Sequence, residues 1–262
     1  MKKLLIVLLL ILFTVSCGSK KDISVKLGYI GEIDKSIWEY VQNQLKAKNI
    51  ILELIQFSDY SVLNKALEND NIDLNHFQNY AYFVNETNKN DYYLSIIART
   101  FIASMNMYSR NLNDLSQLKI HSKIAVPNDY VNLSRALKIL ESIGLIKLKK
   151  STYEGYNFTL NDIVENYLQL EIIPVEASNL YSFISSADAV LVNLNLNFDF
   201  KNENVLYYDD PKKYDSDMYI NIIAARLEDS NNGAYKVVSD YYKNRIKEFV
   251  DAGKLPGIII DY

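Results

Sequence analysis

Short apolar runs alternate with longer amphipathic segments along most of the chain. Residues 24–30 predict a first strand, and residues 50–57 predict a second. The helix expected between them has an apolar face made of Ile37, Tyr40, Val41 and Leu45. A further helix is expected over residues 58–67, with Ser58 or Asp59 as its cap. Two strand–helix units in succession indicate parallel strands and an α/β protein.

The alternation continues to the end of the chain and begins anew after Tyr108. Residues 74–86 are expected to form a helix, and residues 235–250 a closing helix. The expected strands are 92–99, 101–109, 123–126, 170–176, 187–194, 205–208 and 219–227. The last of them is largely apolar, which is typical of a strand buried on both faces.

The new start near Tyr108 indicates a second folding unit, and the apolar strand at 219–227 is suited to complete the sheet of the first. We therefore expect two α/β lobes. The first contains residues 23–108 and 210–262, and the second contains residues 109–209. A cleft between two such lobes is a common place for a small ligand.

Residues 126–149 combine an apolar helical stripe with a positive charge near the expected helix start. Gly144 is the expected stop, and Asn132 or Asp129 the expected cap. Arg135 would then lie in or near the first turn, where the helix dipole already favours an anion. Its planar fork suits a carboxylate ligand, with a solvated surface arginine as the alternative. The stripe consists of Leu133, Ala136, Leu137, Leu140 and Ile143.

Residues 1–16 have the features of a signal peptide, with two lysines ahead of an apolar run from Leu4 to Val15. A small residue precedes Cys17, the chain's only cysteine, which resembles the cleavage box of a lipoprotein. Cleavage would make Cys17 the acylated, palmitate-bearing first residue, with residues 17–22 as a lipidated tether. The alternatives are a plain secretory signal and an uncleaved anchor, but the run is shorter than the roughly 20 residues that span a bilayer.

Composition and charge argue against several classes of protein. The chain has 28 basic and 32 acidic residues and a formal net charge of −4, which argues against nucleic acid as a partner. One cysteine leaves no disulfide framework. The sequence has no GxSxG, HExxH, Walker A or GxGxxG pattern, so an enzyme is not expected.

The sequence also gives no reason to expect a metal or another cofactor. His76 and His121 lie far apart, and neither has metal-ligand spacing with another histidine or cysteine. A cluster of carboxylates near the end of the second lobe could hold calcium, but a solvated loop is the expectation for these residues. They are Asp209, Asp210, Asp215 and Asp217.

Five segments resemble the NlpA/MetQ family of methionine-binding lipoproteins in their order and spacing. They are DLNHFQNYAYF, VPNDYVNLSRALKILESIGLIKLK, NDIVEN, VLVNLN and MYINIIAAR, within a match from about Ser24 to Phe249. The resemblance implies a type II periplasmic-binding-protein fold with two α/β lobes and a hinge. It also implies an extracytoplasmic solute-binding lipoprotein that delivers L-methionine, a related amino acid or a dipeptide to an ABC permease and its ATPase.

The resemblance further implies which residues would meet the charged end of an amino acid. Arg135 matches the family's carboxylate-binding arginine, and Asn132 stands just ahead of it. Asn193 and Asn221 match asparagines that meet the ligand's backbone, where amide oxygens accept from an ammonium without adding charge. Judged by pattern alone, the last two asparagines could equally be turn or capping residues.

The side chain of the ligand would meet aromatic residues. Phe77 and Tyr82 match aromatic positions of the family, which is consistent with contacts between sulfur and rings, and Tyr60 is a further pocket candidate. By pattern alone these residues could belong to the core. Asn79 and Ala81 stand where the family has histidine and proline, so they are expected to affect which side chain is bound.

The main alternative is a surface lipoprotein with a structural or adhesive role that reuses the same fold. Such a protein would not need Arg135 to meet an anion. For either role we expect a monomer held by its lipid at the extracytoplasmic side of the cell membrane, facing the periplasm or exposed on the cell surface.

Overall fold

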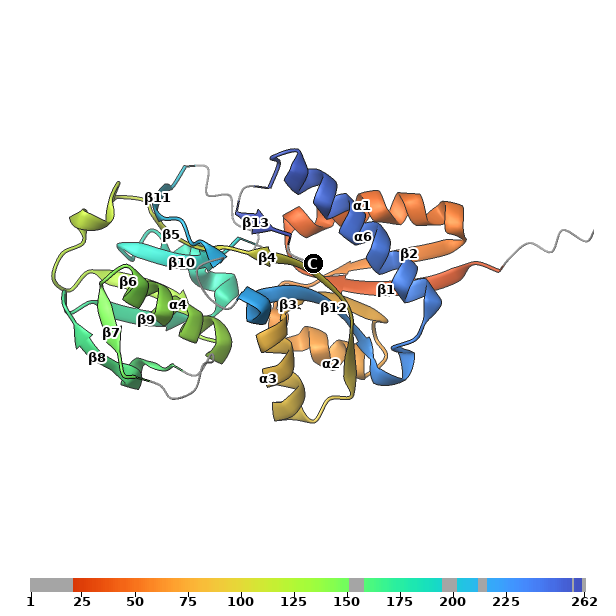
Figure 1. The fold of residues 1–262 in the computed structure, drawn as a ribbon, viewed down its shortest axis with the longest axis horizontal. Coiled ribbons are helices and arrows are strands. Elements are labelled where there is room, and N and C mark those ends of the chain that lie inside the picture. The colour runs from red at the N-terminus through yellow and green to blue at the C-terminus, as the bar shows by residue number, and fades with distance from the viewer. Residues whose placement is uncertain (1–20, 151–157, 195–201, 212–215, 256, 261–262) are drawn as a thin grey trace, which may run out of the picture.

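The protein consists of two lobes, each built around its own β-sheet (Figure 1). The computed structural model describes residues 21–150, 158–194, 202–211, 216–255 and 257–260. The predicted signal peptide, the predicted lipidation site and most of the predicted tether lie outside these residues. Of the helices that are described, none has the length and apolar character that crossing a membrane requires.

The first lobe is organised around a six-stranded sheet with the spatial order β13-β4-β12-β3-β1-β2. β1 pairs in parallel with β2, as the two successive strand–helix units predict, and also with β3, which was not predicted as a strand. β12 returns from late in the chain and pairs antiparallel with β3 and β4, so it completes the sheet as expected. The strands are β1 Ile23–Tyr29, β2 Ile50–Gln56, β3 Leu74–Asn79, β4 Leu94–Ala103, β12 Ile220–Arg226 and β13 Ile258–Ile259.

Two pairs of helices cover the two faces of this sheet (Figure 1). On one face α1 and α6 bury Trp38 and Tyr242 in a core with residues of β1, β2 and β4. On the other face α2 and α3 bury Leu67 and Phe83 against β12. The helices are α1 Glu32–Leu45, α2 Leu63–Glu68, α3 Tyr80–Asn90 and α6 Gly233–Asp251.

The buried face of α1 differs in one position from the predicted face. Tyr40 is 39% exposed, and the guanidinium carbon of Arg245 lies 3.7 Å from its ring centroid. Trp38, which is fully buried, stacks on Tyr242 of α6 instead. A large ring thus lies on each side of the helix, and the sequence pattern did not show which one faced the core.

Residues 74–86 form a strand followed by a helix, so the prediction of one continuous helix is wrong in its first half. All of β3 is buried, because the strand lies between β1 and β12 with helices on both faces of the sheet. No alternation of polar and apolar positions is therefore visible in its sequence. Its buried amide side chains are satisfied by hydrogen bonds with one another and with Asn64 of α2.

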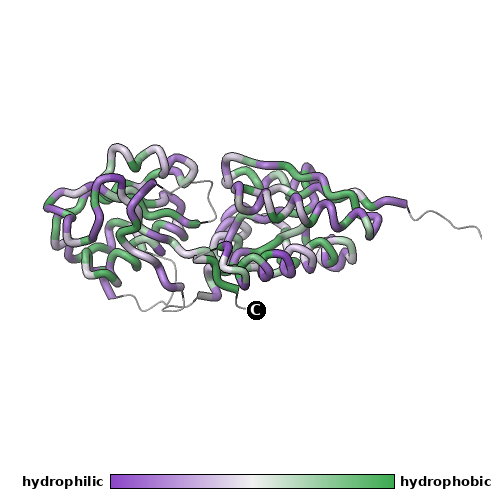
Figure 2. Tube along the Cα trace, turned by 90° about the horizontal axis from the view of Figure 1, so that it is seen from above, coloured by the Kyte–Doolittle hydropathy of each residue, from purple (hydrophilic) through white to green (hydrophobic). Residues whose placement is uncertain are grey.

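The second lobe contains a five-stranded sheet with the order β11-β5-β10-β6-β9, which confirms the predicted α/β class. β6 is parallel to β9 and β10, and β5 is antiparallel to β10 and β11. Figure 2 shows hydrophobic positions in both lobes, and each lobe has its own core. The strands are β5 Met105–Ser109, β6 Lys123–Pro127, β9 Glu171–Val175, β10 Ala189–Asn193 and β11 Asn204–Tyr207.

Helices and a small second sheet complete this lobe (Figure 1). α4 Tyr130–Ser142 buries the predicted apolar stripe, and α5 Leu180–Phe183 packs near β6 and β10. α4 ends as predicted before Gly144, whose φ of +76° favours glycine. β7 Ile146–Leu148 and β8 Ile163–Asn166 form a two-stranded sheet that the sequence reading did not identify.

The chain passes between the lobes twice. β4 ends at Ala103 in the first sheet and β5 begins at Met105 in the second, so the first passage is at Ser104. The amide nitrogen and the hydroxyl of Ser104 both donate to the carbonyl oxygen of Gly257, at 2.9 and 2.7 Å. The return lies between β11 and β12. The crossing predicted near residue 108 falls within β5.

Candidate functional site

A pocket lies between the two lobes, and both lobes supply its wall. The first lobe contributes the ends of β3 and β4 and the start of β12, and the second contributes α4 and the end of β10. Every residue that the sequence predicted for ligand binding lines it, namely Arg135, Asn193, Asn221, Phe77, Tyr82, Asn132, Tyr60 and Asn79. The sequence reading missed four further lining residues, Gln78, Ala103, Ala177 and Tyr219.

Helix α4 carries the only ionic side chain among these lining residues. The helix is capped by Asp129, whose carboxylate accepts a hydrogen bond of 2.9 Å from the amide nitrogen of Asn132. Arg135 therefore lies in the second turn of α4 and not in the first, so the exposed amides at the helix start do not explain its environment. The residue is 2% exposed, which excludes the solvated surface arginine.

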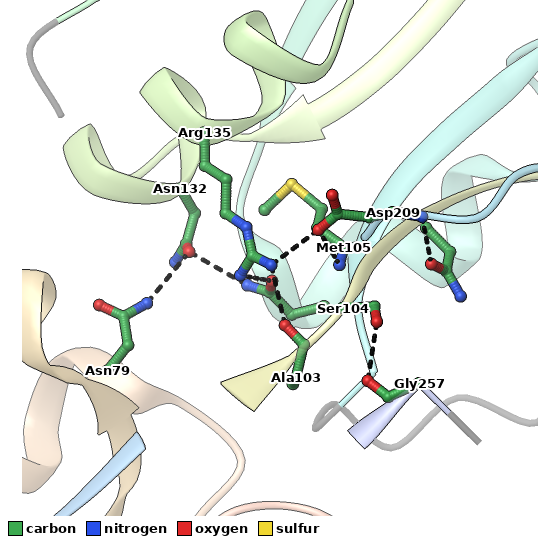
Figure 3. Close-up of polar contacts among 10 residues, drawn as sticks. Asn79, Ala103, Ser104, Met105, Asn132, Arg135, Asp209 and Gly257 are labelled. Atoms are coloured by element: carbon green, nitrogen blue, oxygen red, sulfur yellow. Dashed lines mark hydrogen bonds and ion pairs between the residues drawn. The ribbon is translucent and has the colours of Figure 1, made fainter. Parts of the chain in front are cut away.

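The guanidinium of Arg135 is held by groups from both lobes (Figure 3). Nη2 donates to Oδ2 of Asp209 at 2.8 Å and to the carbonyl oxygen of Ala103 at 2.9 Å. Nη1 donates to Oδ1 of Asn193 at 3.3 Å. The guanidinium carbon lies 4.6 Å from the ring centroid of Tyr219, a cation–π distance. The charged group is thus fixed in position at the pocket wall.

The position of Asp209 corrects the expectation that it belongs to a solvated loop. It is buried, it pairs with Arg135, and it accepts a hydrogen bond of 3.1 Å from the amide nitrogen of Met105. Its own amide nitrogen donates to Oδ1 of Asn106 at 3.0 Å. Asp209 lies just after β11, and hydrogen bonds hold it against β5, the strand that pairs with β11. Its place just after an expected strand was the one signal that the sequence offered.

Asn132 connects side chains of both lobes (Figure 3). Its Oδ1 accepts from Nδ2 of Asn193 at 3.1 Å and, across the cleft, from Nδ2 of Asn79 at 3.5 Å. Its Nδ2 donates to both carboxylate oxygens of Asp129. Asn79 also caps α3 by accepting from the amide nitrogen of Tyr82. These amides hold one another in orientation, so they present a defined set of donors and acceptors to a ligand.

A second polar contact joins the lobes beside this group. The hydroxyl of Tyr60 in the first lobe donates to Oδ2 of Asp129 in the second, at 3.0 Å. Burial raises the pKa of Asp129, although hydrogen bonds from Asn132 and Tyr60 act in the opposite direction. Burial is also the largest cause that raises the pKa values of Tyr60 and Tyr82, with nearby carboxylates adding to it. Both phenols therefore stay protonated at neutral pH.

Aromatic rings also line the pocket. The ring of Tyr82 stands edge-on to those of Tyr60 and Phe77, with centroids 5.4 and 6.0 Å apart. All three belong to one apolar cluster that also contains Tyr219. These rings are therefore packed into a core and also line the pocket. A thioether or other apolar side chain would fit such a wall.

Asn221 is placed by the sheet at the start of β12. Its Nδ2 donates to the carbonyl oxygen of Phe101 at 3.3 Å, and its own carbonyl accepts from the hydroxyl of Thr100 at 2.9 Å. Within the described residues, no group of three or more His, Cys, Asp or Glu is arranged to hold a metal ion. The pocket therefore offers a cation for a carboxylate, amides for polar groups, and rings for an apolar side chain.

Comparison with known proteins gives a consistent result. Residues 25–258 match the model of the NlpA lipoprotein family. The D-methionine-binding lipoprotein MetQ of Escherichia coli O157:H7 is 32% identical over 243 residues, which cover 89% of this chain and 88% of that protein.

Two solved structures have the same fold. A nutrient binding protein from Burkholderia cenocepacia bound to methionine has a TM-score of 0.81 and 28% identity, with 91% of this chain and 100% of that chain covered. The substrate binding protein of a methionine transporter from Streptococcus pneumoniae has a TM-score of 0.80 and 29% identity, with 91% and 96% covered. The two-lobe fold predicted from the sequence is thereby confirmed.

Proposed function

Because the chain belongs to the NlpA lipoprotein family, we propose that it is the solute-binding lipoprotein of an ABC importer. Its ligand is methionine, a closely related amino acid or a short peptide, bound in the cleft between the lobes. The names of its relatives support this proposal, since they describe methionine-binding and transporter substrate-binding proteins. It is a binding protein and has no catalytic role of its own.

One observation carries the proposal. A buried arginine, several oriented asparagines and an aromatic wall line the same pocket, although they come from distant parts of the chain. A free amino acid presents the complementary groups, which are a carboxylate, an ammonium and a side chain. Arg135 binds the carboxylate, Asn193 and Asn221 accept hydrogen bonds from the ammonium or backbone region, and Phe77 and Tyr82 enclose the side chain.

The binding step is coupled to closure of the two lobes. Arg135 belongs to the second lobe, whereas Phe77 and Tyr82 belong to the first, so a ligand that touches all three binds the closed form better than the open form. The difference in affinity between the two forms shifts the equilibrium toward closure. The ABC permease recognises the closed form, and its ATPase provides the energy for import.

The mature protein is held at the membrane by lipid on Cys17, and residues 17–22 form the tether. We place the lobe boundaries at Ser104 and between β11 and β12, close to the predicted boundaries near residues 108 and 210. The protein acts as a monomer on the extracytoplasmic side of the membrane, without a cofactor.

The exchange of histidine for Asn79 and of proline for Ala81 affects the ligand's side chain more than its charged end. Asn79 lines the pocket and caps α3, and Ala81 is fully buried in the aromatic cluster of the first lobe. Both residues are therefore near the rings that enclose the side chain. Arg135 lies on α4, and its partners Ala103, Asn193 and Asp209 lie at the end of β4, at the end of β10 and just after β11, so the charged end of the ligand is held by other elements.

The test is to identify the small molecules released when the purified protein, lacking residues 1–16, is denatured. Mass spectrometry should find methionine at near-stoichiometric yield, and calorimetric titration of the ligand-free protein should then show saturable binding. Another amino acid or a dipeptide would keep the binding-protein role and change the ligand. No released ligand, together with no heat across amino acids and dipeptides, would refute the proposal in favour of a structural or adhesive lipoprotein.

A further inference from the structure

The charge at the pocket wall is balanced before any ligand arrives. Arg135 is the one ionic side chain among the pocket-lining residues in the described part of the chain. Its ion-pair partner, Asp209, does not line this pocket and lies behind the guanidinium. Both side chains are almost completely buried, with 3% and 1% of their surfaces exposed. The pair therefore presents a guanidinium to the ligand while its net charge is zero.

Asp209 is fixed independently of Arg135. Its carboxylate accepts from the amide nitrogen of Met105 at 3.1 Å, and its amide nitrogen donates to Asn106 at 3.0 Å, so two contacts tie it to β5. A carboxylate held in this way cannot move aside when a ligand carboxylate approaches Arg135. Its negative charge consequently acts on every charged group that enters the pocket.

We propose that Asp209 is a specificity-determining residue that makes the site selective for a zwitterion over an anion of the same shape. The inference rests on the proposed function and concerns the charge of the ligand that this site accepts. A zwitterionic amino acid adds no net charge to the neutral Arg135–Asp209 pair. An acid without the ammonium leaves one buried negative charge uncompensated, which is costly in a desolvated site.

Removal of the Asp209 charge should change the affinities for differently charged ligands in opposite directions. A ligand carboxylate on Arg135 loses its repulsion from Asp209, and a ligand ammonium loses its attraction. For a zwitterion the two effects partly cancel, whereas for an anion only the first remains. Asp129 and Glu176 also lie near the pocket, since both carboxylates influence the buried phenol of Tyr60. They are present in wild type and variant alike, so comparing the ratio of affinities in wild type with the ratio in the variant removes their contribution.

A purely orienting role for Asp209 predicts something different. If the carboxylate served only to aim the Arg135 guanidinium, its removal would weaken all ligands with a carboxylate by the same factor. The ratio between two such ligands would then stay constant. The ratio therefore separates a role in charge selection from a role in positioning, even when the variant is less stable or binds more weakly overall.

The experiment compares calorimetric affinities for methionine and for desamino-methionine, which lacks only the ammonium group, in wild type and in Asp209→Asn. Wild type should bind methionine much more tightly. In Asp209→Asn the preference for methionine over the desamino acid should fall about tenfold or more. The affinity of the same variant for methionine amide, which lacks the carboxylate charge, should fall relative to its affinity for methionine.

Two further variants serve as controls. Asp209→Glu keeps the charge and should keep the wild-type ratio. Glu203→Gln removes another buried carboxylate of the same lobe, which pairs with Arg110 away from the pocket, and should also leave the ratio unchanged. An unchanged ratio in Asp209→Asn, with methionine still bound by wild type, would overturn this inference alone. Absence of methionine binding by wild type would refute the proposed function and the inference with it.

Discussion

The hydroxyl of Tyr60 donates a hydrogen bond of 3.0 Å to the carboxylate of Asp129, and the two residues belong to different lobes. The same carboxylate caps α4, the helix that carries Arg135. One partly buried acidic group therefore connects the contact between the lobes with the element that positions the cation. Its protonation state should be visible in the stability of the protein.

Removal of the Asp129 charge should change how stability depends on pH. Burial raises the pKa of Asp129 above its unfolded value, so its favourable contribution is complete below the unfolded pKa and is lost as pH rises through the folded pKa. The variant Asp129→Asn cannot ionise and should gain stability relative to wild type as pH rises above the unfolded pKa of about 3.9. Denaturant unfolding at several pH values measures this difference.

Asp114 provides the matched control because its pKa is shifted in the other direction. A hydrogen bond from Ser116 lowers the pKa of this exposed carboxyl. Its contribution is present above the unfolded pKa and is lost as pH falls through the folded pKa. Asp114→Asn should therefore not gain on wild type as pH rises, and the same trend in both variants would contradict the role given to Asp129.

Exchange of Arg135 for lysine should weaken methionine binding by at least about tenfold, because an ammonium cannot reproduce the planar fork. Arg135→Ala should weaken binding by several kcal/mol, but it also leaves Asp209 buried without its ion-pair partner, which typically costs about 3–5 kcal/mol of stability. Calorimetry on the lysine variant is therefore the cleaner measurement. Arg110→Lys, at a partly exposed ion pair, should bind like wild type. Equal affinity in Arg135→Lys and wild type would contradict a contact between the Arg135 guanidinium and the ligand's carboxylate.

Loss of the Asn79 side chain should lower the free energy of unfolding by about 1 kcal/mol, since it removes the cap of α3. The variant Asn79→Ala also loses the contact to Asn132 across the cleft, so methionine affinity should fall with it. Asn90→Ala, at the exposed end of the same helix, should be nearly neutral in both measurements. An Asn79 variant as stable as wild type would show that the cap has no energetic importance.

The aromatic wall should favour sulfur over a methylene group. Tyr82→Leu should reduce the preference for methionine over norleucine by about 0.3–1.5 kcal/mol, the range expected for a contact between sulfur and a ring. Competition titrations with the two amino acids give this preference directly. Tyr93→Leu, at an exposed ring outside the pocket, serves as the control. A constant preference in Tyr82→Leu would place the ligand's sulfur away from this ring.

Much of the fold could be predicted because its elements are regular and amphipathic. The parallel start of the first sheet and the stripe of α4 follow directly from apolar spacing. β3 could not be recognised, because both of its faces are buried and its polar residues satisfy one another within the core. A sequence pattern reports which side faces water, and this strand has no such side.

The site was predicted only in part for a related reason. Arg135 and the asparagines stand out as polar residues beside apolar runs, and the family resemblance joined them across the chain. Tyr219 and Asp209 have no such pattern, since Tyr219 ends a short 3₁₀ helix ahead of β12 and Asp209 follows β11. Their burial depends on contacts with α4 and β5, which are distant in the sequence.

The most direct test of the account is a crystal structure of the protein with methionine. We expect one methionine molecule between the lobes, with an oxygen of its carboxylate about 2.7–2.9 Å from a guanidinium nitrogen of Arg135. The thioether should contact the rings of Phe77 and Tyr82, and the Arg135–Asp209 pair should remain intact. Methionine bound elsewhere, or bound in this pocket with its carboxylate directed away from Arg135, would contradict the account.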